Sequence, residues 1–212
     1  RRWDVLALGE AMIRLSPPGA QRLEQAACLE VYAGGSEANV AVALARLGLS
    51  TAWVGRLPSN PLGARVVAEL ARHGVDVSKV IWSKEGRVGI YYLEVGGAPR
   101  GSRVVYDRQG SAASQLQADE IDWDILNQTR HLHISGITVA LSASCAEVSR
   151  RALTEAKRRG VSTSLDVNYR SRLWSPEAAR VSLQPLLGVD VAFCTSEDAR
   201  QVFGADGSPL DV

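Results

Sequence analysis

Short apolar runs alternate along this chain with longer segments in which hydrophobic positions recur every three or four residues. The short runs predict buried strands at residues 5–9, 51–55, 131–135, 161–166 and 189–194. The longer segments predict helices at 36–48, 62–73, 119–128, 142–159, 175–187 and 196–203. Repeated strand–helix units predict an α/β fold, with a mainly parallel sheet covered by helices on both faces.

The helix at 36–48 is apolar almost all the way round and follows a pair of glycines. Ser36 is the expected N-cap, and Gly48 is the expected left-handed residue after the helix. A helix with so little polar surface is expected to be buried on most sides. Gly34 and Gly35 would let a ligand approach the backbone just before the helix, although a tight turn into a core helix explains the pair equally well.

The middle of the chain has a different pattern. Extended segments are predicted at 79–83, 87–95 and 102–106, with glycine-containing turns and no helix between them. They predict an antiparallel meander that forms a small sheet of its own. The segment that leads up to Tyr32 is predicted to be irregular or weakly extended.

Composition narrows the class of protein. The chain has 212 residues and a formal net charge of +1, so it offers no basic surface for nucleic acid or an anionic membrane. Cys28, Cys145 and Cys194 lie outside any C-x-x-C pattern and predict free thiols in a reducing compartment. Without a signal peptide or a bilayer-spanning apolar run, a cytoplasmic protein is expected. The first residue is Arg1 rather than Met, so processing or trimming is expected there.

Polar residues repeatedly follow the predicted strands. Because ligands of open parallel sheets bind beyond the carboxyl ends of the strands, these residues predict a cleft at one edge of the sheet. They are Glu10, Gly34, Gly35, Asn39 and the segments 135–137, 166–170 and 195–198.

The sequence lacks the fingerprints of several known kinds of site. It has no G-x-x-x-x-G-K-[ST], and residues 34–39 do not fit G-x-G-x-x-G, so neither a P-loop nor a dinucleotide site is expected. No zinc-ligand spacing and no nucleophile elbow is present. His131 and His133 alternate along one predicted strand and are expected to be partly buried strand residues rather than ligands.

Two arginines point to an anionic ligand. Arg108 follows the meander and Arg170 follows a core strand, and arginine favours planar, bidentate recognition of carboxylate or phosphate. Converging on one cleft they would select an anionic, hydroxyl-rich small molecule, whereas each alone is typical of a surface arginine. Tyr91 or Tyr92 would cover such a ligand, unless the pair only packs across strands.

Four segments carry a family resemblance. The run from Gly34 to Gly48 resembles the N-terminal signature of the ribokinase-like (PfkB) sugar kinases, and segments 105–114, 133–137 and 166–174 support it. Asp-x-Asn-x-Arg-x-x-Leu-Trp, at 166–174, is shared with fructokinases. Tyr-Asp-Arg-x-Gly-Ser-Ala, at 106–112, is most similar to the 2-keto-3-deoxygluconate kinases. The resemblance covers essentially the whole chain.

The resemblance implies a ribokinase-like three-layer α/β/α core with a small β lid, and a sugar site between them. The core would comprise residues 1–13, 34–85 and 110–212, and the lid residues 14–33 and 86–109, with the C-terminal part of the fold missing. Lid strands in this family commonly pair between subunits, so a homo-oligomer through the lid is expected.

The resemblance also implies a set of site residues. The substrate-binding set would be Gly34, Gly35, Asn39, Tyr91, Tyr106, Arg108, Ile137 and Arg170, with the two arginines holding a substrate carboxylate. The implied reaction transfers the γ-phosphoryl group of ATP to a primary hydroxyl, with Mg²⁺ neutralising the phosphates. The nucleotide side would involve Asn168, Thr195 and Asp198, and no residue of this chain is expected to be a metal ligand.

The chain departs from the family pattern at three places. Thr195-Ser196-Glu197-Asp198 stands where the family often has Asn-x-x-Glu, and Glu10 stands where many relatives have aspartate. The family's Gly-Ala-Gly-Asp signature, which supplies the catalytic base and an anion hole, is not in this sequence, which ends at Val212. We therefore expect the sugar-binding part of a kinase without the catalytic base.

Three functional hypotheses follow. The leading one is phosphorylation of 2-keto-3-deoxygluconate to its 6-phosphate. The second is a fructokinase or another ribokinase-like kinase of a neutral sugar. The third is a non-catalytic sugar-binding or assembly protein, which would be stable as a 212-residue species, whereas a truncated kinase should expose an unpaired sheet edge and aggregate.

The 212-residue chain alone is expected to be inactive or nearly so, because its sequence lacks the segment that supplies the base. The measurement is ATP-dependent phosphorylation of 2-keto-3-deoxygluconate, with a full-length kinase of the family as the positive control. Turnover by this chain at normal enzyme rates would contradict the prediction.

Overall fold

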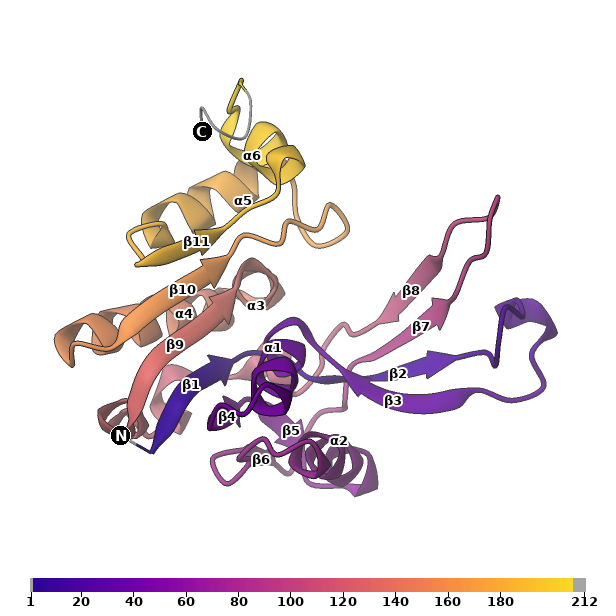
Figure 1. The fold of residues 1–212 in the computed structure, drawn as a ribbon, viewed down its shortest axis with the longest axis horizontal. Coiled ribbons are helices and arrows are strands. Elements are labelled where there is room, and N and C mark those ends of the chain that lie inside the picture. The colour runs from indigo at the N-terminus through magenta and orange to yellow at the C-terminus, as the bar shows by residue number, and fades with distance from the viewer. Residues whose placement is uncertain (1, 208–212) are drawn as a thin grey trace.

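The computed structural model describes residues 2–207 of the chain. Its largest sheet has five parallel strands in the order β11-β10-β9-β1-β4 (Figure 1). The strands are β1 Trp3–Leu8, β4 Thr51–Val54, β9 Thr129–Ser135, β10 Ser162–Asp166 and β11 Val191–Phe193. The predicted α/β fold with a mainly parallel sheet is confirmed. The outer ends of the predicted core ranges, residue 1 and residues 208–212, lie outside the described residues.

Helices cover both faces of this sheet, and successive residues of β1 show the division. Leu6 belongs to a core cluster that includes Ala152 of α4, whereas Ala7 belongs to a second cluster that includes Ala41 of α1. Because side chains alternate along a strand, α4 and α1 lie on opposite faces and the core has three layers. The helices are α1 Ser36–Arg46, α2 Pro61–Arg72, α3 Gly136–Leu141, α4 Ala143–Arg158, α5 Pro176–Leu183 and α6 Ser196–Phe203.

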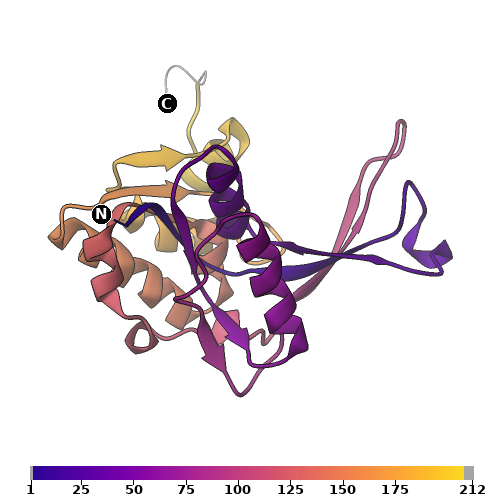
Figure 2. The ribbon, with the colours of Figure 1, turned by 60° about the horizontal axis from the view of Figure 1, so that its bottom comes forward.

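A second sheet of four strands projects away from this core (Figures 1 and 2). Its order is β3-β2-β7-β8, and β2 and β7 pair in parallel while the outer pairs are antiparallel. The strands are β2 Met12–Ser16, β3 Glu30–Gly34, β7 Ile90–Glu94 and β8 Arg103–Asp107. We call this the lid sheet; the exact division of the chain into core and lid ranges stays a prediction.

One prediction about extended segments is wrong. The meander does not include residues 79–83, because β6 (Ile81–Ser83) pairs in parallel with β5 (Arg56–Pro58) in a separate two-stranded sheet. The segment that leads up to Tyr32 has no strand at residues 17–29 and becomes extended where β3 pairs with β2 from Glu30 to Gly34. Which strands pair depends on the path of the chain in space, and a short apolar run carries little information about that path.

The helix predicted at 119–128 is also wrong in kind. It consists of two 3₁₀ segments, Ala118–Glu120 and Trp123–Gln128. Between them the side chain of Asp122 accepts a hydrogen bond from the backbone N–H of Asp124 at 3.1 Å, and this local bond starts a new turn instead of continuing the first. The remaining 3₁₀ segments are Leu23–Gln25, Ala113–Gln115 and Gln184–Leu186.

The first helix begins and packs differently from its prediction. Gly35, not Ser36, is the N-cap residue of α1, and no side chain caps the first turn. Gly48 does have a left-handed φ of 91°, as predicted. The helix is not buried on most sides: within it only Glu37, Ala38 and Ala41 are buried. An apolar sequence alone therefore overstated how much of this helix the rest of the chain covers.

The chain crosses between the core and the lid sheet four times, at residues 9–11, 34–35, 84–89 and 108–112, and we call these crossings the joint. Backbone hydrogen bonds tie the third crossing to β2 and to the fourth crossing. The N–H of Ile13 donates to the oxygen of Gly89 at 2.9 Å, and the N–H of Ala112 donates to the oxygen of Arg87 at 2.8 Å. Contacts within the joint therefore set the position of the lid sheet relative to the core.

The structure also bears on membrane-spanning helices and on the cysteines. Among residues 2–207 no helix is both long and apolar enough to cross a membrane. The three cysteines are free thiols, as predicted, with Cys145 buried and Cys28 and Cys194 exposed.

Candidate active site

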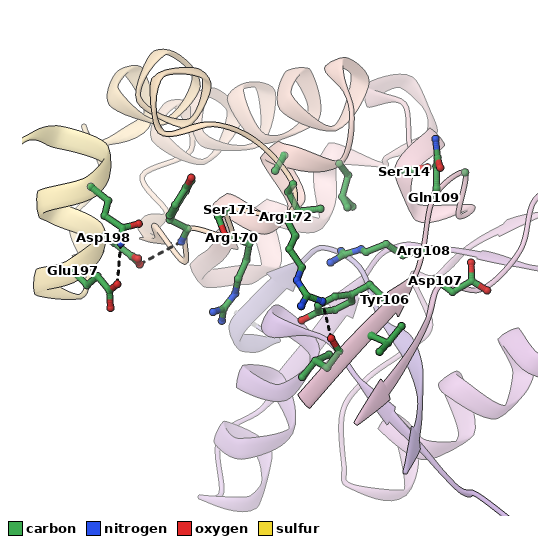
Figure 3. A pocket seen from close by; sticks show the side chains of 18 residues that line it. Tyr106, Asp107, Arg108, Gln109, Ser114, Arg170, Ser171, Arg172, Glu197 and Asp198 are labelled. Atoms are coloured by element: carbon green, nitrogen blue, oxygen red, sulfur yellow. Dashed lines mark hydrogen bonds between the residues drawn. The ribbon is translucent and has the colours of Figure 1, made fainter. Parts of the chain in front are cut away.

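A cleft of 1040 Å³ lies between the lid sheet and the loops at the carboxyl ends of the core strands (Figure 3). One wall is β8 and the segment after it, and the other is the loop after β10 and the start of α6. Four predicted site residues, Tyr106, Arg108, Arg170 and Asp198, line this cleft. The structure brings them together from three separate parts of the sequence, while their contacts with a substrate stay predictions.

Three arginines gather in the middle of the cleft (Figure 3). Arg170 is exposed and makes no side-chain hydrogen bond or ion pair with any other described residue. Arg172 reaches across the cleft, where its Nη1 donates to the backbone oxygen of Val104 in β8 at 2.7 Å. Arg170 therefore presents free N–H donors to any anion that enters, and Arg172 links the core to the lid sheet.

Arg108 is held by protein groups. Its side chain is 10% exposed, and its Nη2 donates to Oε2 of Glu10 in an ion pair. The other oxygen of Glu10, Oε1, accepts a hydrogen bond from Oγ of Ser111 at 2.6 Å. The Cζ of Arg108 also lies 5.7 Å from the ring centroid of Tyr106. Only part of the Arg108 guanidinium is thus left for a ligand.

A second buried carboxyl group lies beside this ion pair. Glu37, in the first turn of α1, is 1% exposed, and its Oε1 accepts a hydrogen bond from Oγ1 of Thr138 at 2.6 Å. The pKa of Glu37 is raised to about 7, mainly by burial and to a smaller extent by the charge of Glu10, while the hydrogen bond from Thr138 and the charge of Arg108 act in the opposite direction. The site therefore holds two buried carboxyl groups against the one guanidinium of Arg108.

One row of side chains crosses the whole lid sheet in register, namely Tyr32, Arg14, Tyr91 and Tyr106. The Cζ of Arg14 lies 4.2 Å from the ring centroid of Tyr32, and the ring centroids of Tyr91 and Tyr106 are 5.9 Å apart. Because Tyr106 lines the cleft, Tyr91 stands next to a cleft residue. Tyr92, the alternative left open by the sequence, faces the other side of the strand.

Packing within the joint accounts for the glycine pair. A Cβ on Gly34 would stand 2.3 Å from the hydroxyl oxygen of Tyr91, and one on Gly35 would stand 2.2 Å from the backbone oxygen of Glu10. Both distances are far inside van der Waals contact, so neither site has room for a side chain. A close approach of a sugar to these glycines stays a prediction.

Two further predicted substrate residues, Asn39 and Ile137, do not line the cleft of Figure 3. Asn39 is exposed in the first turn of α1. Ile137 is at the start of α3, where its backbone N–H donates to Oγ of Ser135 at 3.2 Å. Gly34, Gly35 and Tyr91 likewise lie outside the lining of this cleft. Some of the predicted substrate-binding residues therefore line the cleft, and the others lie in the joint, in the lid sheet or at the starts of α1 and α3.

The three residues predicted on the nucleotide side contact other protein groups. Asn168 has a left-handed φ of 43°, and its Nδ2 donates to Oγ of Ser36 at 2.9 Å. Thr195 is the N-cap of α6, where its Oγ1 accepts from the N–H of Asp198 at 3.0 Å. Oδ2 of Asp198 accepts from the N–H of Tyr169 at 3.3 Å. These bonds fix the loop that follows β10 against the ends of α1 and α6.

The cleft has an acidic end beside its basic middle. Glu197 and Asp198 line it at the start of α6, away from Arg108 (Figure 3). Burial and the charge of Asp198 raise the pKa of the nearby Asp166. Carboxylate oxygens are the ligands that Mg²⁺ takes, although no group of three His, Cys, Asp or Glu side chains within residues 2–207 could hold a metal ion by itself.

The histidines are strand residues, as predicted. His131 and His133 lie in β9, and the Nδ1 atoms of their rings hydrogen-bond to Oγ of Ser162 and Ser164 respectively, both at 2.8 Å. Burial lowers the pKa of His133 to about 4, so this ring is neutral near pH 7.

The sequence did not predict the roles of Glu37, Thr138 and Arg172, and it placed Glu10 at the predicted cleft edge without predicting its partners. Two signals were available: Glu37 lies inside an apolar helix turn, and Glu10 directly follows a buried strand. Carboxyl groups are rarely buried without a partner, so both positions suggested a polar contact. Thr138 and Arg172 gave no signal, since their partners, Glu37 and Val104, lie far away in the sequence.

The comparisons with known proteins agree with one another. A family profile described as "pfkB family carbohydrate kinase" matches residues 3–212. The 2-dehydro-3-deoxygalactonokinase of Haloferax volcanii is 44% identical over 96% of this chain, and the 2-dehydro-3-deoxygluconokinase of Thermoproteus tenax is 34% identical over 95%. The crystal structure of 2-dehydro-3-deoxygluconokinase from Thermotoga maritima superposes with a TM-score of 0.94, at 40% identity, over 99% of this chain. The chain spans 64%, 62% and 65% of the lengths of these three proteins.

The packing of the glycine pair can be tested with Gly35→Ala. The backbone oxygen of Glu10 has to move to make room for the new Cβ, so we expect a loss of about 1–3 kcal/mol in the free energy of unfolding. Gly97→Ala is the control, because a Cβ there meets nothing within 4 Å. The measurement is urea unfolding of both variants, and equal stability of the two would contradict the packing argument.

The buried carboxyl of Glu37 predicts a pH dependence of stability. Its folded pKa of about 7 lies above the ordinary value of 4.5, so its stabilising contribution is complete below pH 4.5 and is lost as the pH rises through 7. The change is on the order of 3 kcal/mol at most, at about 1.4 kcal/mol per pKa unit.

Glu37→Gln, which stays neutral, is expected to remove this dependence. Urea unfolding at pH 5 and pH 8 measures it, with Glu85→Gln, an exposed site, as the control. If the wild type and Glu37→Gln lose the same stability between the two pH values, Glu37 does not titrate in this range.

Proposed function

The chain belongs to the pfkB family of carbohydrate kinases, and on that premise we propose that it serves the ATP-dependent phosphorylation of a sugar acid. The substrate we propose is 2-keto-3-deoxygluconate, converted to its 6-phosphate, or the closely similar galactonate. The similarity to a 2-dehydro-3-deoxygalactonokinase and to 2-dehydro-3-deoxygluconokinases supports this class of substrate.

The observation that carries the proposal is the unpaired guanidinium of Arg170 in the cleft, with Arg108 on the same lining. A carboxylate entering the cleft would meet planar N–H donors suited to bidentate binding. A neutral sugar has no group that matches this charge. The carboxylate of a sugar acid would match the donors of Arg170 and the part of the Arg108 guanidinium that Glu10 does not use.

In this proposal the lid sheet covers the sugar. Tyr106 and Tyr91 would lie over it, and the backbone near Gly35 together with Asn39 and Ile137 would contact its hydroxyl groups. Lid residues in contact with the sugar would also exclude water, which otherwise competes as the phosphoryl acceptor. Assembly through the lid sheet and a cytoplasmic location belong to the same proposal and stay predictions.

The acidic end of the cleft suits the nucleotide. Asp198 would face the Mg²⁺ ion and the phosphates of ATP, with Asn168 and Thr195 beside it. Mg²⁺ in such sites is held by one or two carboxylates together with phosphate oxygens, and it neutralises the charge that develops on the transferred group. The part assigned to this chain is to bind and orient the sugar acid, because its sequence contains no Gly-Ala-Gly-Asp segment to supply a base.

Arg170→Ala tests the proposal, since the side chain of Arg170 makes no hydrogen bond or ion pair with another residue in the range 2–207. Binding of 2-keto-3-deoxygluconate, measured by calorimetry, is expected to weaken by about 10- to 100-fold, the usual worth of a hydrogen-bonded charge. Arg46→Ala, an exposed arginine at the end of α1, is the control. Affinity for the acid that stays within twofold of the wild type, or an equal loss for fructose, would count against the proposal.

A further inference from the structure

Glu10 stands at the first crossing from the core to the lid sheet, between the end of β1 and the start of β2. Its side chain is 1% exposed, and both of its carboxylate oxygens have partners. Oε2 accepts from Nη2 of Arg108, and Oε1 accepts from Oγ of Ser111 at 2.6 Å. An acid this deeply buried persists only where its charge and its lone pairs are satisfied.

Both partners of Glu10 belong to the last crossing, where the chain returns from β8 to the core. Ser111 there forms a β-bridge with Arg87 of the preceding crossing, and a Cβ added at Gly89 would stand 2.9 Å from Oε1 of Glu10, so this crossing also lies against the carboxylate. One carboxylate thus connects the chain segment that enters the lid sheet with the segment that leaves it.

The guanidinium of Arg108 is only partly used by this contact. Within residues 2–207 its hydrogen bonding is confined to Nη2, and its Nε is buried without a partner. The residue nevertheless lines the cleft. A planar guanidinium that is fixed through one nitrogen keeps its other N–H donors in a defined direction, so a ligand need not restrict the side chain when it binds.

We propose that Glu10 is a positioning residue for the sugar-acid site, which holds the Arg108 guanidinium by Nη2 and leaves its Nη1 for the ligand carboxylate. This rests on the proposed function, because it takes Arg108 as a ligand of the substrate. The role of Glu10 is geometric: its own negative charge lies near the incoming carboxylate and opposes binding, so the gain must come from the direction it gives to Arg108.

The length and the charge of the Glu10 side chain can be changed separately, which gives a direct test. Glu10→Asp keeps the charge but is one methylene shorter and cannot span Arg108 and Ser111 together. Glu10→Gln keeps the length, with its amide oxygen accepting from Arg108 and its amide nitrogen donating to Ser111. If Glu10 positions Arg108, Glu10→Asp should weaken binding of the sugar acid and Glu10→Gln should preserve it. If the negative charge of Glu10 is what matters, the opposite result is expected.

The experiment is calorimetric binding of 2-keto-3-deoxygluconate to the wild type, Glu10→Asp, Glu10→Gln, Arg108→Ala and the Glu10→Asp/Arg108→Ala double variant. Urea unfolding accompanies each, so that affinities are compared among folded proteins. We expect Glu10→Asp to bind about tenfold more weakly or worse, as for a misplaced binding group. Glu10→Gln should stay within about threefold of the wild type, and Glu10→Asp should have no further effect once Arg108 is absent.

The outcomes separate this inference from the function on which it rests. If Arg108→Ala binds the acid as well as the wild type does, the carboxylate assignment itself is overturned. If Arg108→Ala loses affinity while Glu10→Asp does not, only the positioning role is overturned. A loss in Glu10→Gln as large as that in Glu10→Asp would also overturn the positioning role, because a side chain of the right length would then not be sufficient. Should Glu10→Asp fail to fold, Ser111→Ala replaces it, and unchanged affinity there would overturn the role.

Discussion

The buried contact of Glu10 with Arg108 and Ser111 is the interaction on which the relation between the lid sheet and the core depends. It connects the segment that enters the lid sheet with the one that leaves it, and it does so next to a second buried carboxyl, Glu37. Two acids beside one guanidinium are stable together only if one of them is neutral, which agrees with the raised pKa of Glu37. Charge interactions therefore contribute to the structure of the joint, together with close packing.

The joint determines part of the charge distribution in the cleft. Arg108 and Arg170 both line the cleft, Arg108 held by Glu10 and Arg170 without a hydrogen-bond partner for its side chain among residues 2–207, and Asp198 lies at the acidic end. The glycines at 34 and 35 let the lid sheet approach closely, with Tyr91 and the backbone of Glu10 filling the space that side chains would need. An anionic ligand matches the arginines on this lining, and the sugar acid that we propose as the substrate carries such a group.

The places of the core strands could be predicted from the sequence, whereas the pairing of the lid and joint segments could not. The runs 5–8 in β1 and 51–54 in β4 are largely apolar and each ends before a glycine, so local pattern was enough to place them. The pairing of β6 with β5 and of β2 with β7 joins segments far apart in the chain, and local pattern carries no record of it. Arg108 and Arg170 could be predicted as candidates from residue type, but the partner that occupies Arg108 could not, because Glu10 lies 98 residues away.

The most direct test of the account is a crystal structure of this chain with 2-keto-3-deoxygluconate bound. We predict that the ligand carboxylate lies within hydrogen-bond distance of the guanidinium groups of both Arg108 and Arg170, with Glu10 still paired to Nη2 of Arg108. A carboxylate that binds elsewhere, with the arginines contacting only hydroxyl groups or solvent, would contradict the account.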